Sequence, residues 1–160
     1  MWQSLRPLFA WCQNSWLGTT ISDSTWAFAY IEVFHLLGLT VFLGSLLILS
    51  MRMAGLILKS QTVAGVRQEV NPYLWGGLIL VTLSGVLQFS SEALKCFDSP
   101  PFQYKMALYF AALLFQFTVF RRVAIANENR FNPLAKKATA AICLILWFGV
   151  GIAGRAIGFF

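Results

Sequence analysis

The chain has 160 residues, of which 58% are hydrophobic and 11% charged, and its mean hydropathy is +0.69. A soluble domain carries roughly 25% charged residues, so this composition excludes an ordinary soluble protein and indicates an integral membrane protein in a lipid bilayer. The net charge of +6 does not indicate nucleic-acid binding, because the basic residues stand between apolar segments, as membrane topology requires.

Residues 1–17 are too short and too polar to span a bilayer. Tryptophan, leucine and phenylalanine alternate there with polar residues, which is typical of an amphipathic helix lying among the lipid headgroups. The segment lacks the basic region and long apolar core of a cleavable signal peptide. We expect Gly18 to end it, and the run SDST at 22–25 to supply caps for the next helix.

Four later segments are apolar and close to the length of about 20 residues that a membrane-spanning helix needs. The predicted spans are 26–49, 73–89, 104–120 and 138–158, and the first could continue to 53. The pair Asn71-Pro72 marks the start of the second span. The sequence therefore predicts an all-α fold, an integral membrane four-helix bundle with an N-terminal interfacial helix, as a single domain over 1–160.

Lysine and arginine are unequally divided between the two ends of these spans. Eight belong to the loops after the first and third spans, and four lie at the opposite ends. Because basic residues favour the cytoplasmic side, we predict a multi-pass protein of a bacterial inner membrane with both termini in the periplasm.

The first span contains a carboxylate, Glu32, and the only histidine of the chain, His35. The two are three residues apart and share one face of the helix, about 9 Å and 14 Å below its outer end. Ionisable residues inside a span are costly and are functional candidates. A purely structural pairing of the two is the simpler reading. In either case an ionised Glu32 at this depth needs a basic partner, and Arg155 or Lys105 is the natural candidate.

The other three spans bring polar residues to the same outer half. These residues are Ser84, Gln88 and Ser91 in the second span, Lys105 and Met106 in the third, and Arg155 in the fourth. Simpler roles exist for several of them. Lys105 can extend its ammonium to the headgroups, and Gln88 and Ser84 can form interhelical hydrogen bonds.

Arg155 follows Gly154, which with Gly158 has the spacing of a closely packed helix face. We therefore expect Arg155 to point into protein. Together the polar residues predict a pocket centred on Glu32 and His35 in the outer half, and an inner half that is almost wholly apolar.

The three cysteines have no C-x-x-C spacing and no pairing with histidine, so we expect no zinc site. Cys12 and Cys96 both fall on the predicted outer side, where a disulfide between them could hold the N-terminal segment over the bundle. Cys143, inside the fourth span, is expected to stay reduced and buried.

Five short motifs follow one another along the chain: Glu32-x-x-His35-x-x-Gly38, Gly44, Arg52-x-x-Gly55, Phe102-Gln103-Tyr104-Lys105 and Gly154-Arg155. Over most of the chain this pattern resembles a bacterial family of small four-helix inner-membrane proteins with a domain of unknown function. Tyr30 departs from it where a proline is usual, and Met51 where an acidic residue precedes the arginine. The run His-Leu-Leu-Gly at 35–38 is also similar to haem b and copper-resistance four-helix membrane proteins.

Three functions are compatible with these residues. The first is binding of haem b, with His35 as the iron ligand, for electron transfer or small-ligand chemistry. Lys105 and Arg155 would then hold the propionates, and Glu32 would orient the site. With one histidine, the second axial position falls to Met106, to a second subunit or to a small ligand.

The second function is a transport component in which Glu32, His35 and Arg155 bind an ion or a proton. The third is an accessory or structural subunit, in a homo-oligomer or a larger membrane complex, whose polar residues only fix helix packing.

Overall fold

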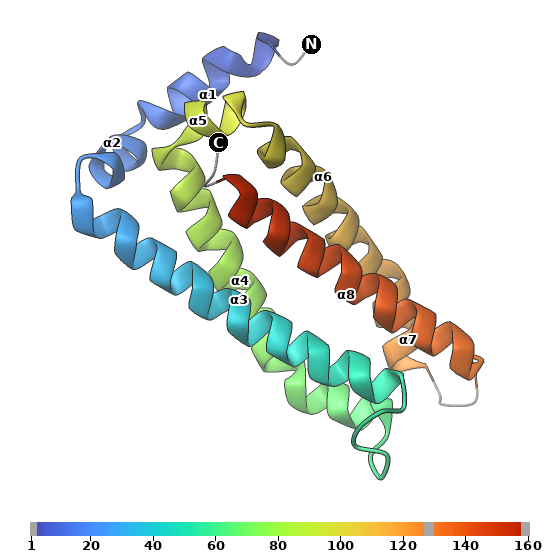
Figure 1. The fold of residues 1–160 in the computed structure, drawn as a ribbon. Helices are drawn as coiled ribbons and strands as arrows, with labels where there is room; N and C mark the ends of the chain where they lie inside the picture. The colour runs from blue at the N-terminus through green and yellow to red at the C-terminus, as the bar shows by residue number, and fades with distance from the viewer. Residues whose placement is uncertain (1–2, 127–129, 158–160) are drawn as a thin grey trace.

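The computed structural model describes residues 3–126 and 130–157. Four helical segments in it are long and apolar enough to cross a membrane, and they lie side by side as a bundle (Figure 1). They are α3 (Thr25–Met53), α4 (Val63–Ser91), the continuous segment Pro100–Ile125, and α8 (Pro133–Ala156). The described residues form no strand. The predicted all-α four-helix membrane bundle is confirmed.

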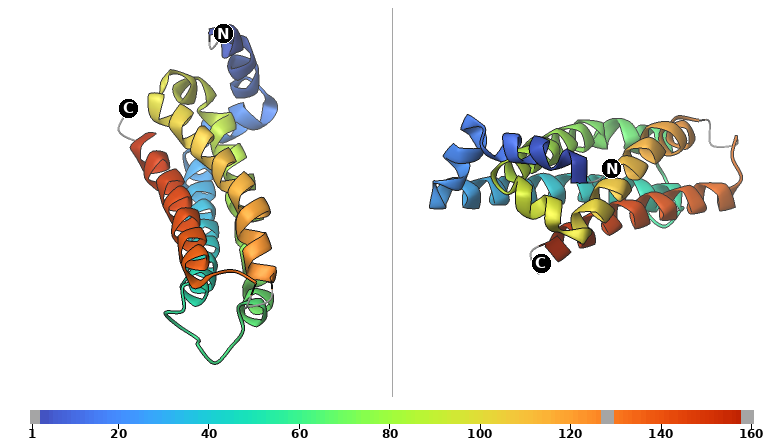
Figure 2. Two further views of the ribbon diagram at one scale, coloured as in Figure 1. Left: turned by 90° about the vertical axis from the view of Figure 1, so that its right-hand side faces the viewer. Right: turned by 90° about the horizontal axis from the view of Figure 1, so that it is seen from above.

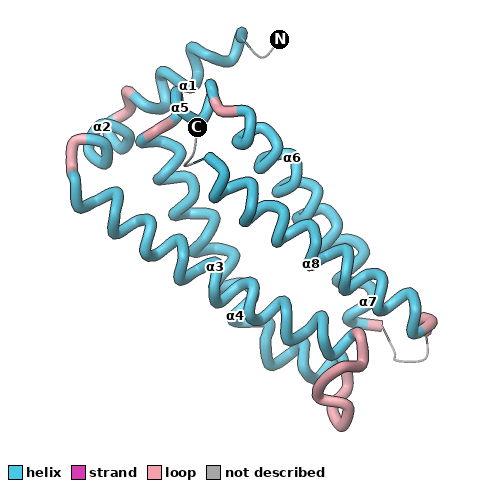
Figure 3. Tube along the Cα trace, viewed as in Figure 1, coloured by secondary structure: helices cyan, strands magenta, loops and turns pink. Residues whose placement is uncertain are grey.

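Short helices cover one end of the bundle, and the first and the last described residues lie at that end (Figures 1 and 2). These helices are the 3-10 turn η1 (Gln3–Leu5), α1 (Arg6–Gln13), α2 (Trp16–Ser22) and α5 (Ala93–Asp98). We call this the terminal end, and the opposite end, which carries loop 54–62, the loop end. Figure 3 shows that the connecting loops are confined to these two ends.

The N-terminal segment is helical and amphipathic, as predicted. Phe9 of α1 packs against Phe97 of α5 with 5.2 Å between ring centroids, whereas Trp11 and Trp16 are 70% and 78% exposed. Exposed tryptophan beside a packed face suits the membrane interface. The break, however, comes at Ser15, which caps α2, and Gly18 lies inside that helix instead of ending the segment.

The second span starts ten residues earlier than predicted, at Val63, because the Thr62 hydroxyl accepts a hydrogen bond from the amide of Gly65 and caps the helix. Pro72 lies inside α4, so the start predicted at Asn71-Pro72 was wrong. A proline removes one backbone hydrogen bond, and packing of α4 along α3 keeps the helix continuous.

The third span is also longer than predicted. It comprises α6 (Pro100–Phe115), a π-helical turn η2 (Gln116–Phe120) and α7 (Arg121–Ile125). The fourth begins at Pro133, where the Asn132 side chain accepts from the amide of Leu134. Gly158, the predicted end of that span, lies outside the described residues.

The core lies where α3 crosses α4 and meets α8. A Cβ atom placed on Gly77 would stand 2.6 Å from the backbone nitrogen of Phe42, so the two backbones are in direct contact. The ring of Phe42 packs edge-on against Trp147 of α8, with 4.5 Å between ring centroids. Outward-facing side chains such as Ile145 and Ile152 are 69% and 71% exposed, as expected of a surface in contact with lipid.

Candidate functional site

His35 is half-buried on the side of α3 that faces α4. Its Nδ1 lies 3.0 Å from the Ser84 hydroxyl oxygen, and that hydroxyl donates its own proton to the Leu80 carbonyl. With the Ser84 proton engaged at Leu80, the tautomer that suits this contact carries its proton on Nδ1 of His35. In this tautomer Nε2 keeps its lone pair and can bind a metal or accept a proton.

Two glycines, Gly85 and Gly154, leave space for the side chains of His35 and Lys105. A Cβ atom on Gly85 would lie 3.3 Å from Cε1 of His35, so the imidazole rests on the backbone of α4. A Cβ atom on Gly154 would lie 3.4 Å from both Cε and Nζ of Lys105, so this side chain runs along α8. The Lys105 ammonium is near enough to His35 to act on it electrostatically. All four spans thus contribute to one cluster.

We call His35, Ser84, Gly85, Lys105 and Gly154 the histidine cluster. Two other predicted site residues, Gln88 and Met106, are half-buried on the helices that form it. Among the described residues, no group of three or more histidine, cysteine, aspartate or glutamate side chains could hold a metal ion. Any metal chemistry at the cluster must therefore use His35 as the single imidazole ligand.

Glu32 does not join this cluster. It is exposed, and among the described residues it forms no hydrogen bond or ion pair. The predicted pairing of Glu32 with Arg155 or Lys105 was wrong, because near its start α3 runs away from α8 toward α2 (Figure 1). Arg155 is exposed as well, which differs from the burial in protein that we expected.

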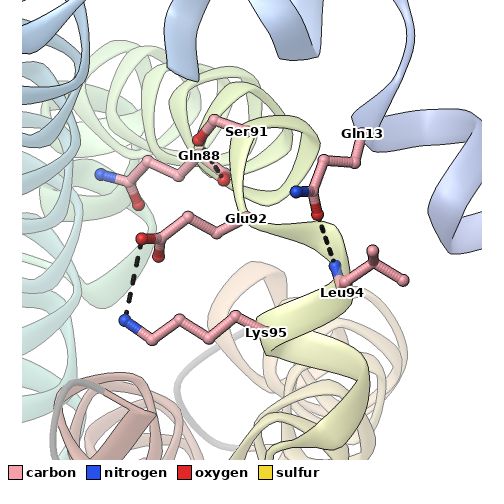
Figure 4. A network of polar contacts seen from close by, with 6 residues as sticks. All are labelled: Gln13, Gln88, Ser91, Glu92, Leu94 and Lys95. Carbon is pink, nitrogen blue, oxygen red and sulfur yellow. Dashed lines mark hydrogen bonds and ion pairs between the residues drawn. The ribbon is translucent and has the colours of Figure 1, made fainter. Parts of the chain in front are cut away.

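A second set of polar side chains lies at the terminal end, around the junction of α4 and α5 (Figure 4). Glu92 and Lys95 pair at 3.7 Å, and the side chain of Gln88 extends toward the same side. Gln13 accepts a hydrogen bond of 2.8 Å from the amide of Leu94 and so ties the end of α1 to α5. The N-terminal helices are therefore held over the bundle by packing and by this amide.

The disulfide considered between Cys12 and Cys96 is not formed. Both are free thiols in the structure, and Cys143 is a free, buried thiol as predicted. Burial, reinforced by the nearby carboxylate of Glu92, raises the pKa of the Cys96 thiol to about 11. Cys96 is therefore protonated, and a poor nucleophile, at neutral pH.

Slow alkylation of Cys96 is the expected consequence. At pH 8 a thiol with this pKa is ionised in about one molecule in a thousand, and its rate should rise about tenfold per pH unit until it titrates. Site-resolved mass spectrometry after iodoacetamide treatment measures this rate. The chain unfolded in SDS serves as the reference, and an equal rate in folded and unfolded protein would contradict the burial of Cys96.

Sequence reasoning missed a buried polar cluster in the half of the bundle nearer the loop end. Gln116, in the π-helical turn η2, accepts a 2.7 Å hydrogen bond from Nε1 of Trp147, and the Cys143 thiol lies 3.6 Å from the same oxygen. This half is therefore not almost wholly apolar. One signal was present, a single amide residue inside an apolar span, and π-helical turns are frequent at functional sites.

Removing this amide should destabilise the protein. Gln116→Leu leaves the buried Trp147 N–H without an acceptor, and we expect a loss of about 1–2 kcal/mol in the free energy of unfolding. Thermal unfolding in detergent measures it. Gln103→Leu, which changes an exposed glutamine of α6, is the matched control, and equal melting of both variants would contradict the assigned bond.

Comparison with known proteins gives one match. The model of a family of unknown function, DUF6644, matches residues 8–160. No curated protein and no solved structure matches the chain.

Proposed function

The chain belongs to the family of unknown function DUF6644, and we propose from its own residues that it binds haem b through Nε2 of His35. The observation that carries this proposal is the 3.0 Å hydrogen-bond contact between Nδ1 of His35 and the Ser84 hydroxyl. Metal-bound histidines commonly donate their other ring N–H to such a partner, which fixes the tautomer and the ring orientation. Neutral imidazole is a common axial ligand of haem iron, and bundle cores are common sites for it.

The other residues of the histidine cluster support the proposal. Gly85 and Gly154 take little space beside the imidazole and the lysine, and the Lys105 ammonium offers a positive charge to a propionate. Met106, next to Lys105 on α6, would be the candidate for a second iron ligand, with a second subunit or a small ligand as the alternatives. Bound haem would supply one-electron transfer or small-ligand binding, and we propose one of these as the function.

The orientation is part of the proposal. The excess of lysine and arginine near the loop end supports a bacterial inner-membrane protein whose termini face the periplasm. The histidine cluster then lies in the periplasmic half of the bilayer, where a redox partner in that compartment can approach it.

The absorption spectrum of the purified protein tests haem binding. Protein produced in cells supplied with a haem precursor, and purified in mild detergent, should show a Soret band and about one haem b per chain by the pyridine haemochrome assay. A featureless spectrum and no iron in protein from such cells would refute the proposal.

A structural role is the second candidate, and one observation favours it. The His35–Ser84 hydrogen bond joins α3 to α4, the helix pair with the most extensive contact in the described bundle. In an accessory subunit this bond would be the whole role of His35. The two candidate functions therefore predict different results for His35→Ala: loss of haem if His35 binds iron, and loss of stability alone if it only packs.

A further inference from the structure

A polar pocket of about 180 Å³ lies between α4 and the end of the third span, toward the loop end. The polar side chains that line it are Arg67, Asn71, Gln116 and Arg121. Its apolar wall includes Trp75 and Phe117, which stack with 5.5 Å between ring centroids. The histidine cluster lies in the other half of the bundle and shares no residue with this pocket.

The two arginines of the pocket lack a carboxylate partner. Neither Arg67 nor Arg121 forms an ion pair or a hydrogen bond within residues 3–126 and 130–157, yet they are near enough to act on one another electrostatically. Arg67 is half-buried, so its charge is only partly screened by water. Two guanidinium groups facing one cavity repel each other unless an anion lies between them, and guanidinium forks suit phosphate oxygens.

An apolar groove of about 350 Å³ continues from this pocket between α4 and α6. The groove shares Trp75, Leu78 and Phe117 with the pocket and extends toward the middle of the bundle along residues 79–83 and 109–113. Its one polar pair is internally satisfied, because the hydroxyls of Thr82 and Tyr109 are 2.8 Å apart. Ile79 and Leu83 are 53% and 61% exposed, so the groove opens toward the lipid.

We propose that the pocket and groove together bind one anionic phospholipid, with its phosphate between Arg67 and Arg121 and an acyl chain along the groove. The surface is cationic and polar at the pocket and apolar along the groove, which matches the order of anionic headgroup and acyl chain in such a lipid. The depth also agrees, since Arg67 lies eight residues, or about 12 Å, nearer the loop end than Trp75. The predicted cytoplasmic side of the loop end is the side where basic pockets between helices bind anionic headgroups.

Native mass spectrometry of the delipidated protein in detergent tests this assignment. We expect dioctanoyl phosphatidylglycerol to bind at least about tenfold more tightly than dioctanoyl phosphatidylcholine. Arg67→Gln and Arg121→Gln should each remove this preference, and Arg67→Lys should keep part of it. Arg122→Gln changes an exposed arginine that does not line the pocket, and it should bind as the unaltered protein does.

Two further measurements distinguish a bound phospholipid from a bound free phosphate ion. Leu83→Trp fills the exposed groove and should weaken binding of the lipid, and inorganic phosphate at millimolar concentration should not displace it. Displacement by inorganic phosphate, with no effect of Leu83→Trp, would overturn the lipid assignment. Equal binding of both lipids to the unaltered protein, or equal losses in the Arg67 and Arg122 variants, would overturn the site. Circular dichroism and gel filtration establish that each variant is folded.

Discussion

Haem is expected to be lost completely from the His35→Ala variant, while the four-helix bundle stays folded. The variant removes the only imidazole of the chain and with it the proposed axial ligand. The hydrogen bond to Ser84 disappears too, but a single interhelical hydrogen bond in a membrane protein contributes only about 0.6–2 kcal/mol. The haem content per chain and the melting temperature, measured on the same preparation, give the two readouts.

Two further variants test whether haem is lost because the histidine cluster is altered. Ser84→Ala keeps the imidazole but frees its orientation, and we expect haem affinity to fall about 10–100-fold. Thr40→Val alters an exposed hydroxyl of α3 that donates to the Leu36 carbonyl of its own helix, and it should keep full haem content. If His35 is only a packing residue, His35→Ala and Ser84→Ala should lower the melting temperature equally, and neither spectrum should change.

The Gly77→Leu variant is expected to destroy the packing of α3 on α4. Even the Cβ atom would lie 2.6 Å from the Phe42 nitrogen and 2.9 Å from its Cα, and these are backbone atoms that cannot rotate away. The helices would have to separate, which also withdraws Phe42 from Trp147. Overpacking costs about 1–3 kcal/mol and more where no side chain can yield, so we expect more than about 3 kcal/mol. Unfolding in mixed SDS micelles measures the loss.

The neighbouring glycine provides the control. Within the described part of the chain, no atom outside the local helix backbone lies within 4 Å of a Cβ placed on Gly76, so Gly76→Leu adds a side chain on an open surface of the same helix. We expect its free energy of unfolding to be unchanged or increased by about 0.5–1 kcal/mol, since glycine weakens a helix interior. If both variants unfolded alike, the close crossing at Gly77 would be refuted.

Hydropathy alone identified the four spans, but it misplaced their ends. The capping signals before α3 were read correctly, whereas Pro72 was taken as a helix start and lies within α4. A proline is favourable in the first turn of a helix and is tolerated, at a cost, inside one. Which of the two occurs depends on whether the residues before the proline pack as a helix against a neighbouring helix. The start at Val63 has its own local signal, the cap from Thr62, and packing on α3 keeps the helix continuous through Pro72.

The candidate site was predicted in part. Helical spacing and an estimate of depth predicted that His35, Ser84 and Lys105 lie at one level. In the structure Ser84 contacts His35, and Lys105 is near enough to act on it electrostatically. Glu32 is three residues before His35 on α3, but its side chain is exposed and does not join the cluster. Which residues share a level follows from chain position, but which of them face one another depends on helix rotation and crossing angle.

The amino-acid sequence by itself determined that this protein is a four-helix membrane bundle with one histidine in a span. That much depends on the length and hydrophobicity of each segment, which are local properties. The tertiary structure alone decided that Nδ1 of His35 meets the Ser84 hydroxyl, that Gln116 accepts a hydrogen bond from Trp147, and that Arg67 and Arg121 line one pocket. Each of these pairs joins different helices, and only the packing of side chains between helices determines such contacts.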